Sequence, residues 1–284
     1  MASKTLKDGR IESRVANYAG FFEKDYSKDS KVQQENRLEN YADVINGYYD
    51  GATELYEYGW AQSFHFSRFY KGEGFHQSLA RHEHYLAAQM KLKPGMKVLD
   101  VGCGIGGPAR EIARFSNAHI TGIFSVLKPG GVFGVYEWVM TDAYDASNAD
   151  HRRIAHGIEI GDGIPEMRTR ADSRKALLSV GFQIEHDEDL AERPDPVPWY
   201  YPLEGDLRKA QTIGDYGTVF RTTKFGMWTT STMVWVLETF GLVPKGTWSV
   251  GETLKISASA LVEGGQKKLF TPMLLYVCRK PATG

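Results

Sequence analysis

The hydrophobic pattern changes most clearly between residues 97 and 115, where a short apolar run leads into glycines and then into a helical repeat. Lys97 to Val101 has the pattern of a buried parallel strand. Pro108 stands where a first helical turn would begin, and residues 109–115 continue as a helix. The glycines between them allow a sharp turn and a close approach to a bound molecule. The pattern therefore predicts a strand, a glycine-rich loop and a helix, which is the arrangement of a nucleotide-binding site.

The remaining chain alternates between helical and extended patterns. Apolar spacing over residues 31–49 predicts a helix that ends at Gly51, and residues 77–92 follow the same spacing. Residues 187–219 carry four prolines and are expected to be irregular. Further helices are expected over 174–180 and 227–240, and further strands over 118–123, 132–139, 182–186 and 269–278.

Aromatic side chains are concentrated between Tyr48 and Phe75, where ten occur in 28 residues and Leu55 is the only aliphatic residue larger than alanine. Aromatic ring faces carry negative charge density, which suits a cationic ligand or a cationic reaction intermediate. The alternative is that these rings only pack the N-terminal part of the chain onto the main domain.

Asp100 stands at the end of the predicted strand, two residues before the first glycine of the loop. Dehydrogenase fingerprints usually have an apolar residue there. Doubly wound enzymes that bind S-adenosylmethionine instead place a carboxylate there, which meets the ammonium of the methionine part. The alternative is that Asp100 only caps the loop.

Composition narrows the possible functions. The 284 residues, 42% hydrophobic and 24% charged, suit one large α/β domain or one domain with an added lobe. A net charge of −1 argues against a nucleic-acid surface. The two cysteines form no disulfide framework, and we expect neither a signal peptide nor a membrane span. His82-Glu83-His84 lies in a predicted helix, where neighbours two apart face different directions, so we expect no metal site.

Several longer motifs resemble the sterol 24-C-methyltransferases, above all the fungal enzymes of ergosterol synthesis. The resemblance runs from about residue 40 to the end of the chain. The motifs are Tyr56-Glu57-Tyr58-Gly59-Trp60, residues 63–73, residues 80–86, the Asp100 loop, residues 136–142, Gly161-Asp162-Gly163-Ile164-Pro165, residues 198–203 and residues 268–273.

The resemblance implies an α/β fold of the S-adenosylmethionine methyltransferase type, with a Rossmann-like, doubly wound sheet. It implies S-adenosyl-L-methionine as the cofactor and methylation of the C-24 side-chain position of a zymosterol-like sterol. The methylated side chain becomes a cation, which loses a proton after a hydride shift. The implied partners are a sterol and further copies of the chain, in a tetramer. The implied location is the cytoplasmic face of the endoplasmic reticulum or a lipid droplet, as a peripheral protein.

The motif match also assigns residues to roles. Tyr56, Tyr58 and Trp60 are implied in catalysis, with His65 and Glu137 as candidate bases beside His82 and Glu83. The implied sterol-binding residues are Phe64, Phe66 and Tyr70, and the implied cofactor-binding residues are Asp100, Gly102, Cys103, Gly104 and Gly106.

The chain departs from this family at Ile123-Phe124. Residues 124–131 are too few for the crossover between parallel strands, which takes at least ~10 to 12 residues. The family has a long segment here, and the resemblance implies that this chain lacks it. Residues 112–136 also contain no Asp or Glu for the ribose hydroxyls of a nucleotide. We therefore expect weak cofactor binding. We also expect that the strands on either side of the missing segment pair directly with each other or that the sheet opens between them.

Four segments are expected along the chain. They are a flexible arm over 1–30, an aromatic cap over 31–93, an incomplete methyltransferase core over 94–190, and a C-terminal sterol methyltransferase lobe with the last core strand over 191–284. Two other functions stay open, namely methylation of another lipid or prenyl-derived molecule, and a catalytically inactive remnant that only binds sterol or partner copies.

Overall fold

The strand, loop and helix predicted around Asp100 are present in the structure. The computed structural model describes residues 13, 17–23, 25–122, 127–243 and 245–282. Strand β1 (Lys97–Asp100) pairs in parallel with β2 (His119–Gly122), and helix α5 (Gly107–Ser116) connects them. Gly106 caps α5 in a left-handed conformation with φ of 81°, and Pro108 lies in the first helical turn.

A second sheet contains the other three strands that the structure describes. Strand β5 (Phe270–Arg279) lies between β3 (Val132–Met140) and β4 (Gln183–Asp189) and is antiparallel to both. Residues 270–278 of β5 are buried, and Met273 belongs to the main hydrophobic cluster together with Ile154, Trp199 and Leu261. This strand is therefore the centre of the sheet and of the core.

The sheet is open between its two parts. Across the described chain no pairing joins β1 to β3, so a single doubly wound sheet is not formed, although the α/β class is confirmed. None of the residues of β1 is fully buried, and Val101 just after it is 64% exposed. The expected break at Ile123-Phe124 lies outside the described residues. Between the two alternatives expected for the shortened sheet, opening is the one observed.

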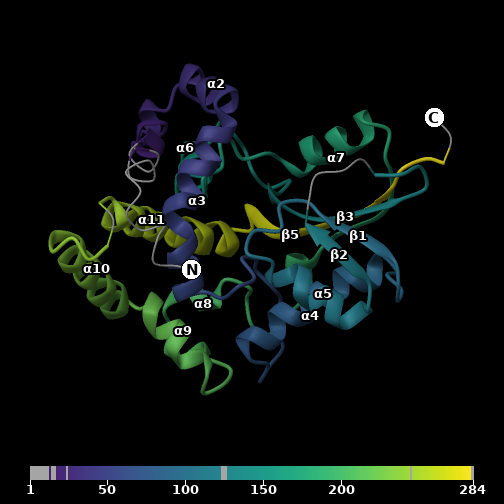
Figure 1. Ribbon diagram of the computed structural model, residues 1–284. Coiled ribbons are helices and arrows are strands. Elements are labelled where there is room, and N and C mark those ends of the chain that lie inside the picture. The colour runs from purple at the N-terminus through teal and green to yellow at the C-terminus, as the bar shows by residue number, and fades with distance from the viewer. Residues whose placement is uncertain (1–12, 14–16, 24, 123–126, 244, 283–284) are drawn as a thin grey trace.

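Helices cover both faces of the strands. Helix α7 (Arg170–Ser179) packs against β3 and β4 on one side. Helix α4 (Phe75–Gln89) packs against α5 and β3 on the other side, as Figure 1 shows. The predicted helix over 77–92 is thus confirmed with shifted ends, as is the one over 174–180.

The helices of the structure differ more from the sequence-based prediction than the strands do. The expected helix over 31–49 is two helices, and the second continues through Gly51 because its apolar face extends to Tyr56. Two long helices over 149–162 and 247–266 were not predicted. The bounds in this part are η2 (Tyr26–Lys28), α2 (Lys31–Glu39), α3 (Tyr41–Gly59), α6 (Ala149–Asp162), η3 (Leu190–Glu192), α8 (Tyr201–Glu204), η4 (Leu207–Lys209), α9 (Asp215–Thr222), α10 (Lys224–Thr239) and α11 (Thr247–Gln266).

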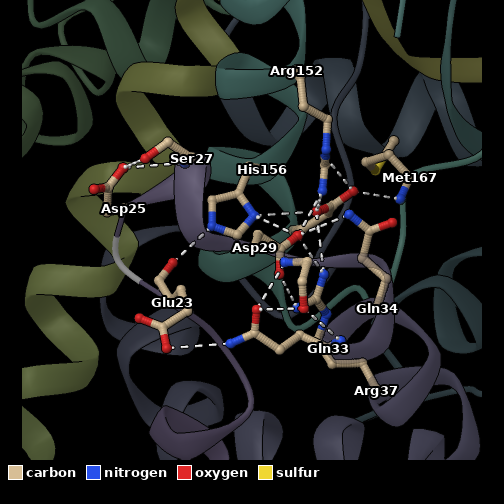
Figure 2. A network of polar contacts seen from close by, with 12 residues as sticks. Glu23, Asp25, Ser27, Asp29, Gln33, Gln34, Arg37, Arg152, His156 and Met167 are labelled. Atoms are coloured by element: carbon tan, nitrogen blue, oxygen red, sulfur yellow. Dashed lines mark hydrogen bonds and ion pairs between the residues drawn. The ribbon is translucent and has the colours of Figure 1, made fainter. Parts of the chain in front are cut away.

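A buried polar network attaches the N-terminal helices to α6 (Figure 2). Arg37 of α2 binds Asp29 with atoms 2.6 Å and 3.0 Å apart, and Arg152 of α6 binds both Asp29 and Glu159. His156 Nδ1 lies 3.5 Å from each of these carboxylates. Asp29, His156 and Glu159 are close enough to hold a metal ion. However, the two arginines already neutralise the two carboxylates, so the cluster indicates a structural role.

Candidate active site

A cavity of about 480 Å³ lies between the aromatic segment and the C-terminal helices. Its wall includes six of the predicted site residues, which are Tyr56, Trp60, Phe64, His65, Phe66 and Glu137. Helix α3 and the loop after it supply the first five, and β3 supplies Glu137 with its neighbours Tyr136 and Trp138. Leu254, Ser257 and Leu261 of α11 also line the cavity. The sheet and the helical part thus meet at one apolar space.

The aromatic rings of this wall are packed against one another. The centroids of Tyr56 and Phe64 are 5.1 Å apart. The rings of Trp60 and Phe66 meet edge to face at 5.0 Å, and Phe66 also contacts Trp138 at 5.5 Å. Phe66 is buried in the main hydrophobic cluster. The same rings form core and cavity wall, so the packing interpretation is confirmed for Phe66, whereas a role of the rings toward a cation stays a prediction.

Tyr58 and Tyr70 lie elsewhere. Tyr58 is 52% exposed and carries the guanidinium of Arg221 over its ring at 4.8 Å. Tyr70 is 45% exposed beneath Arg81 at 3.9 Å. Neither lines the cavity. For Tyr58 the reason is its position two residues after Tyr56 on a helix, which turns it to another face.

His65 is held by Glu83 of α4. The imidazole Nε2 lies 2.9 Å from Glu83 Oε1, and Ser63 donates to the same oxygen at 2.6 Å. His82 is buried, stacks on Tyr136 at 3.9 Å, and has a pKa well below the usual value because burial disfavours its charged form. Glu83 and His82, two of the candidate bases, therefore support the cavity wall, and neither lines the cavity.

Glu137 is a cavity acid without a hydrogen-bond donor in the described chain. Burial raises the pKa of its carboxyl, and no ion pair offsets this effect among the described residues. The group is free to face a ligand in the cavity.

Asp162 is a second cavity acid, which the sequence reasoning did not single out. Its Oδ1 accepts a hydrogen bond from Tyr56 at 3.0 Å, and its Oδ2 accepts one from Ser257 at 2.6 Å. Burial raises the pKa of this carboxyl to about 7, against the lowering effect of both hydrogen bonds. The sequence feature that could have identified Asp162 is its position between two glycines, in a motif that already carried the resemblance.

Gly161 explains how Ser257 reaches this carboxyl. A Cβ at Gly161 would lie 2.1 Å from Ser257 Cβ, so α6 and α11 can cross this closely only because the side chain is absent. Helix α6 then ends at Gly163 in a left-handed conformation with φ of 67°, directly after Asp162. The helix end therefore fixes the acid at the cavity edge.

The glycine loop has the geometry of one half of a cofactor site. Gly102, Gly104 and Gly106 have φ values of 79°, 51° and 81°. A Cβ at Gly102 or Gly104 would meet no atom within 4 Å, so the loop borders open space. The Cys103 thiol stays local and donates weakly to the Gly104 carbonyl at 3.8 Å.

Asp100 completes this half-site. Burial raises the pKa of its carboxyl, and no side-chain hydrogen bond engages it within the described ranges. The loop and Asp100 fit the methionine end of S-adenosylmethionine. Residues 112–136 supply no carboxylate for the ribose.

The half-site and the cavity adjoin. Gly107, the first residue of α5, packs so closely on Gln62 and Ser63 that a Cβ would lie 2.0 Å from the Gln62 carbonyl oxygen. The next residues along the chain, Phe64 and His65, line the cavity. The aromatic segment therefore separates the cofactor loop from the cavity by one layer of chain.

Comparisons with known proteins agree with this geometry. A family model described as sterol methyltransferase C-terminal matches residues 217–282. The sterol 24-C-methyltransferase of Debaryomyces hansenii is 45% identical over 339 positions, which cover 98% of this chain and 90% of the relative. The sterol 24-C-methyltransferase of Schizosaccharomyces pombe is 44% identical over 347 positions, which cover 100% of this chain and 92% of the relative.

Solved structures share the fold at low identity. The mycolic acid cyclopropane synthase CmaA1, solved with SAH and CTAB, has a TM-score of 0.59 at 10% identity and covers 84% of this chain and 97% of its own. The cyclopropane synthase MmaA2 from Mycobacterium tuberculosis has a TM-score of 0.54 at 9% identity, covering 76% of this chain and 90% of its own.

The comparisons also confirm that the chain is shortened internally. The Debaryomyces hansenii alignment has 339 positions and this chain has 284 residues, so at least 55 aligned positions (339 less 284) have no counterpart here. With this deletion, and with the identity that holds over nearly its whole length, the chain belongs to the sterol 24-C-methyltransferase family.

Proposed function

We propose that the chain transfers a methyl group from S-adenosylmethionine to C-24 in the side chain of a zymosterol-like sterol, a step of ergosterol synthesis. One observation carries the proposal, namely that the start of α5, directly after the glycine loop, packs against the segment whose aromatic rings line the cavity. A cofactor on one side of this segment and an apolar substrate on the other would meet at its edge. Family membership supports the same reaction.

The loop residues hold the cofactor in this proposal. When bound, S-adenosylmethionine supplies an electrophilic methyl group. Asp100 accepts hydrogen bonds from the ammonium of its methionine part, and the backbone of Gly102, Cys103, Gly104 and Gly106 borders the cofactor. Residues 112–136, which follow the loop in sequence, contain no acid for the ribose hydroxyls, so we expect weaker binding than in an uninterrupted chain.

The cavity residues act on the sterol. Tyr56, Trp60, Phe64 and Phe66 enclose the side chain and exclude water, and their ring faces stabilise the cation that forms when the alkene accepts the methyl group. The carboxyl of Glu137 lies in the same wall and adds negative charge when ionised. Because Tyr58 and Tyr70 lie outside the cavity, no role at the sterol is proposed for them.

The surface of the C-terminal lobe supports a further part of the proposal. Trp228, Trp235 and Phe240, on or directly after α10, are exposed to solvent by 62%, 54% and 76%. Large exposed apolar side chains mark surfaces that bind a membrane or another protein. No helix in the described portion is long and apolar enough to cross a membrane. We propose peripheral association with the endoplasmic reticulum or a lipid droplet, and a homotetramer.

Methyl transfer can be measured directly. The chain, in excess over zymosterol, is incubated with S-adenosylmethionine that carries a labelled methyl group, and the extracted sterols are identified by mass spectrometry. We expect label in a sterol methylated at C-24. Absence of labelled sterol in a sample where calorimetry detects binding of both molecules would contradict the proposal.

A further inference from the structure

We infer that Asp162 is the catalytic base that takes the proton from the methylated sterol cation, and that Tyr56 and Tyr48 reorganise their hydrogen bonds to accept this change. The inference rests on the proposed methyl transfer and adds the residue that ends the reaction. It starts from a short chain of polar groups at the cavity edge, in a space whose other walls are mainly aromatic and aliphatic.

The chain of groups begins at a backbone carbonyl. Tyr48 donates a hydrogen bond to the Gly161 carbonyl oxygen at 2.9 Å, and its hydroxyl lies 2.8 Å from the hydroxyl of Tyr56. The Tyr56 hydroxyl lies 3.0 Å from Asp162 Oδ1. Ser257 donates separately to Oδ2. Tyr48 is buried, whereas Tyr56 and Asp162 face the cavity.

The number of available protons decides which protonation state of Asp162 satisfies this series of hydrogen bonds. The three contacts from Gly161 to Asp162 need three protons, but two tyrosine hydroxyls supply only two when the carboxyl is ionised. A proton on Oδ1 allows Asp162 to donate to Tyr56, Tyr56 to donate to Tyr48, and Tyr48 to donate to Gly161. Every contact is then satisfied. Protonation of Asp162 is thus favoured by the geometry, which also agrees with the raised pKa of about 7.

No other candidate base has this arrangement. Glu137 has no hydroxyl chain that protonation would complete. His65 is engaged by Glu83, and His82 and Glu83 do not line the cavity. Asp162 combines access to the cavity, a partner network and a reason to take up a proton.

The proposed step balances. Transfer of the methyl group forms a carbon–carbon bond to C-24 from the electron pair of the sterol alkene, while the bond between the methyl group and the sulfonium sulfur breaks and its electron pair stays on sulfur. The positive charge is then on C-25, and a hydride shift from C-24 to C-25 moves it to C-24. A C–H bond of the added methyl group then breaks, and its electrons form a carbon–carbon double bond to C-24. The proton passes to Asp162 Oδ1, which becomes neutral, and it is later released to solvent. A general base of this kind contributes on the order of 10²- to 10⁴-fold to a rate.

The test uses a sterol that carries a tertiary ammonium in its side chain, because this group mimics the cation and needs no turnover. Binding of this sterol and of neutral zymosterol is compared by calorimetry in the parent chain, Asp162→Asn and Glu137→Gln. We expect Asp162→Asn to weaken binding of the ammonium sterol by about ten-fold or more and to weaken binding of zymosterol by far less. Glu137→Gln removes the other cavity acid and should also weaken binding of the ammonium sterol, but the fall in affinity at lower pH described next should remain because Asp162 is intact.

A pH series separates a charge effect from packing. Affinity of the parent chain for the ammonium sterol should fall between about pH 8 and pH 6, because Asp162 gains a proton, and this fall should vanish in Asp162→Asn. The other titratable groups around this space are Tyr18, Tyr48, Tyr49, Tyr56, Tyr136, His65, Glu137 and Lys255. The pKa values of the five tyrosines are raised, mainly by burial, and Lys255 pairs with Glu252 at 2.7 Å.

Three results would overturn the inference. An equal loss of affinity for both sterols in Asp162→Asn would show that Asp162 binds a polar group that the two sterols share. Unchanged binding would remove it from the site, while labelled sterol from the methyl-transfer assay could still uphold the proposed function. Failure of the parent chain to bind either sterol would overturn the proposed function and the inference together.

Discussion

The hydroxyl of Tyr56 donates a hydrogen bond to Asp162 Oδ1 across 3.0 Å, although the two residues stand 106 positions apart in the chain. This contact joins the aromatic segment to the end of α6. It also places an acid with a raised pKa beside a wall of aromatic rings, which is an arrangement that fits the formation and removal of a cation.

The raised pKa of Asp162 predicts how stability depends on pH. In the unfolded chain this carboxyl ionises near its ordinary pKa of 3.8, but in the folded chain it ionises near 7. Between these values the folded state holds a proton that the unfolded state has lost, so this group lowers stability as pH rises from about 4 to 7. Asp162→Asn should remove up to about 4 kcal/mol of that fall.

Chemical denaturation of the parent chain and Asp162→Asn at several pH values measures this effect. The stability of the variant relative to the parent should increase with pH over this window. A constant difference between the two chains would show that Asp162 is ionised normally in the folded state.

The close crossing of α6 and α11 predicts a sharp contrast between two glycines. Gly161→Ala would bring a methyl group onto Ser257 and should destabilise the chain by ~1 to 3 kcal/mol. Gly251→Ala, in α11 with nothing within 4 Å of the new methyl group, should stabilise it by about 0.5 to 1 kcal/mol. Urea unfolding of both variants tests the crossing, and equal effects of the two would argue against it.

The cavity wall predicts a functional difference between two aromatic residues that are close in sequence. Phe64→Leu removes a ring face from the cavity and should slow methyl transfer by roughly two- to thirty-fold, with little change in melting temperature. Tyr58→Leu should leave the rate unchanged, since Tyr58 is exposed outside the cavity. A lower melting temperature with normal turnover in Phe64→Leu would favour a packing role alone.

The position of Asp100 predicts that removal of its charge lowers the affinity for the cofactor. Asp100→Asn removes the charged acceptor for the ammonium of S-adenosylmethionine and should weaken binding by ~1.5 to 3 kcal/mol. Calorimetric titration measures it, with Asp142→Asn as a control at an exposed acid. If the parent and Asp100→Asn bind equally, Asp100 only caps its loop.

Local sequence was sufficient to predict the parts of the fold that local rules determine. The strand, glycine loop and helix from Lys97 to Ser116 follow from an apolar run, glycines and Pro108, and all three are present. Strands β3, β4 and β5 were also predicted within a few residues. Strands β3 and β5 are compact apolar segments, and β4 follows directly after a helix that Gly181 stops. Helix α11 was missed because it is rich in Gly, Ser and Ala and has a weak apolar repeat.

Contacts between distant segments could not be predicted in this way. The sequence showed that the crossover after β2 is too short. It did not show whether the strands on either side of it would pair with each other or leave the sheet open. Likewise, the pairing of Asp162 with Tyr56 and Ser257 depends on three helices that meet through Gly161. Tyr58 and Tyr70 were included with the site because a motif gives spacing but not direction.

If this chain carries out the family reaction with an incomplete cofactor site, restoring the missing segment should improve both cofactor binding and turnover. The chain as it stands is compared with the same chain after a family-length segment is restored behind Ile123, for S-adenosylmethionine binding and for methyl transfer to zymosterol. We expect the restored chain to bind at least about ten-fold more tightly and to turn over faster, because it regains a ribose contact and the strands that cover β1. Equal binding and equal turnover in the two chains would show that the cofactor site is complete without this segment.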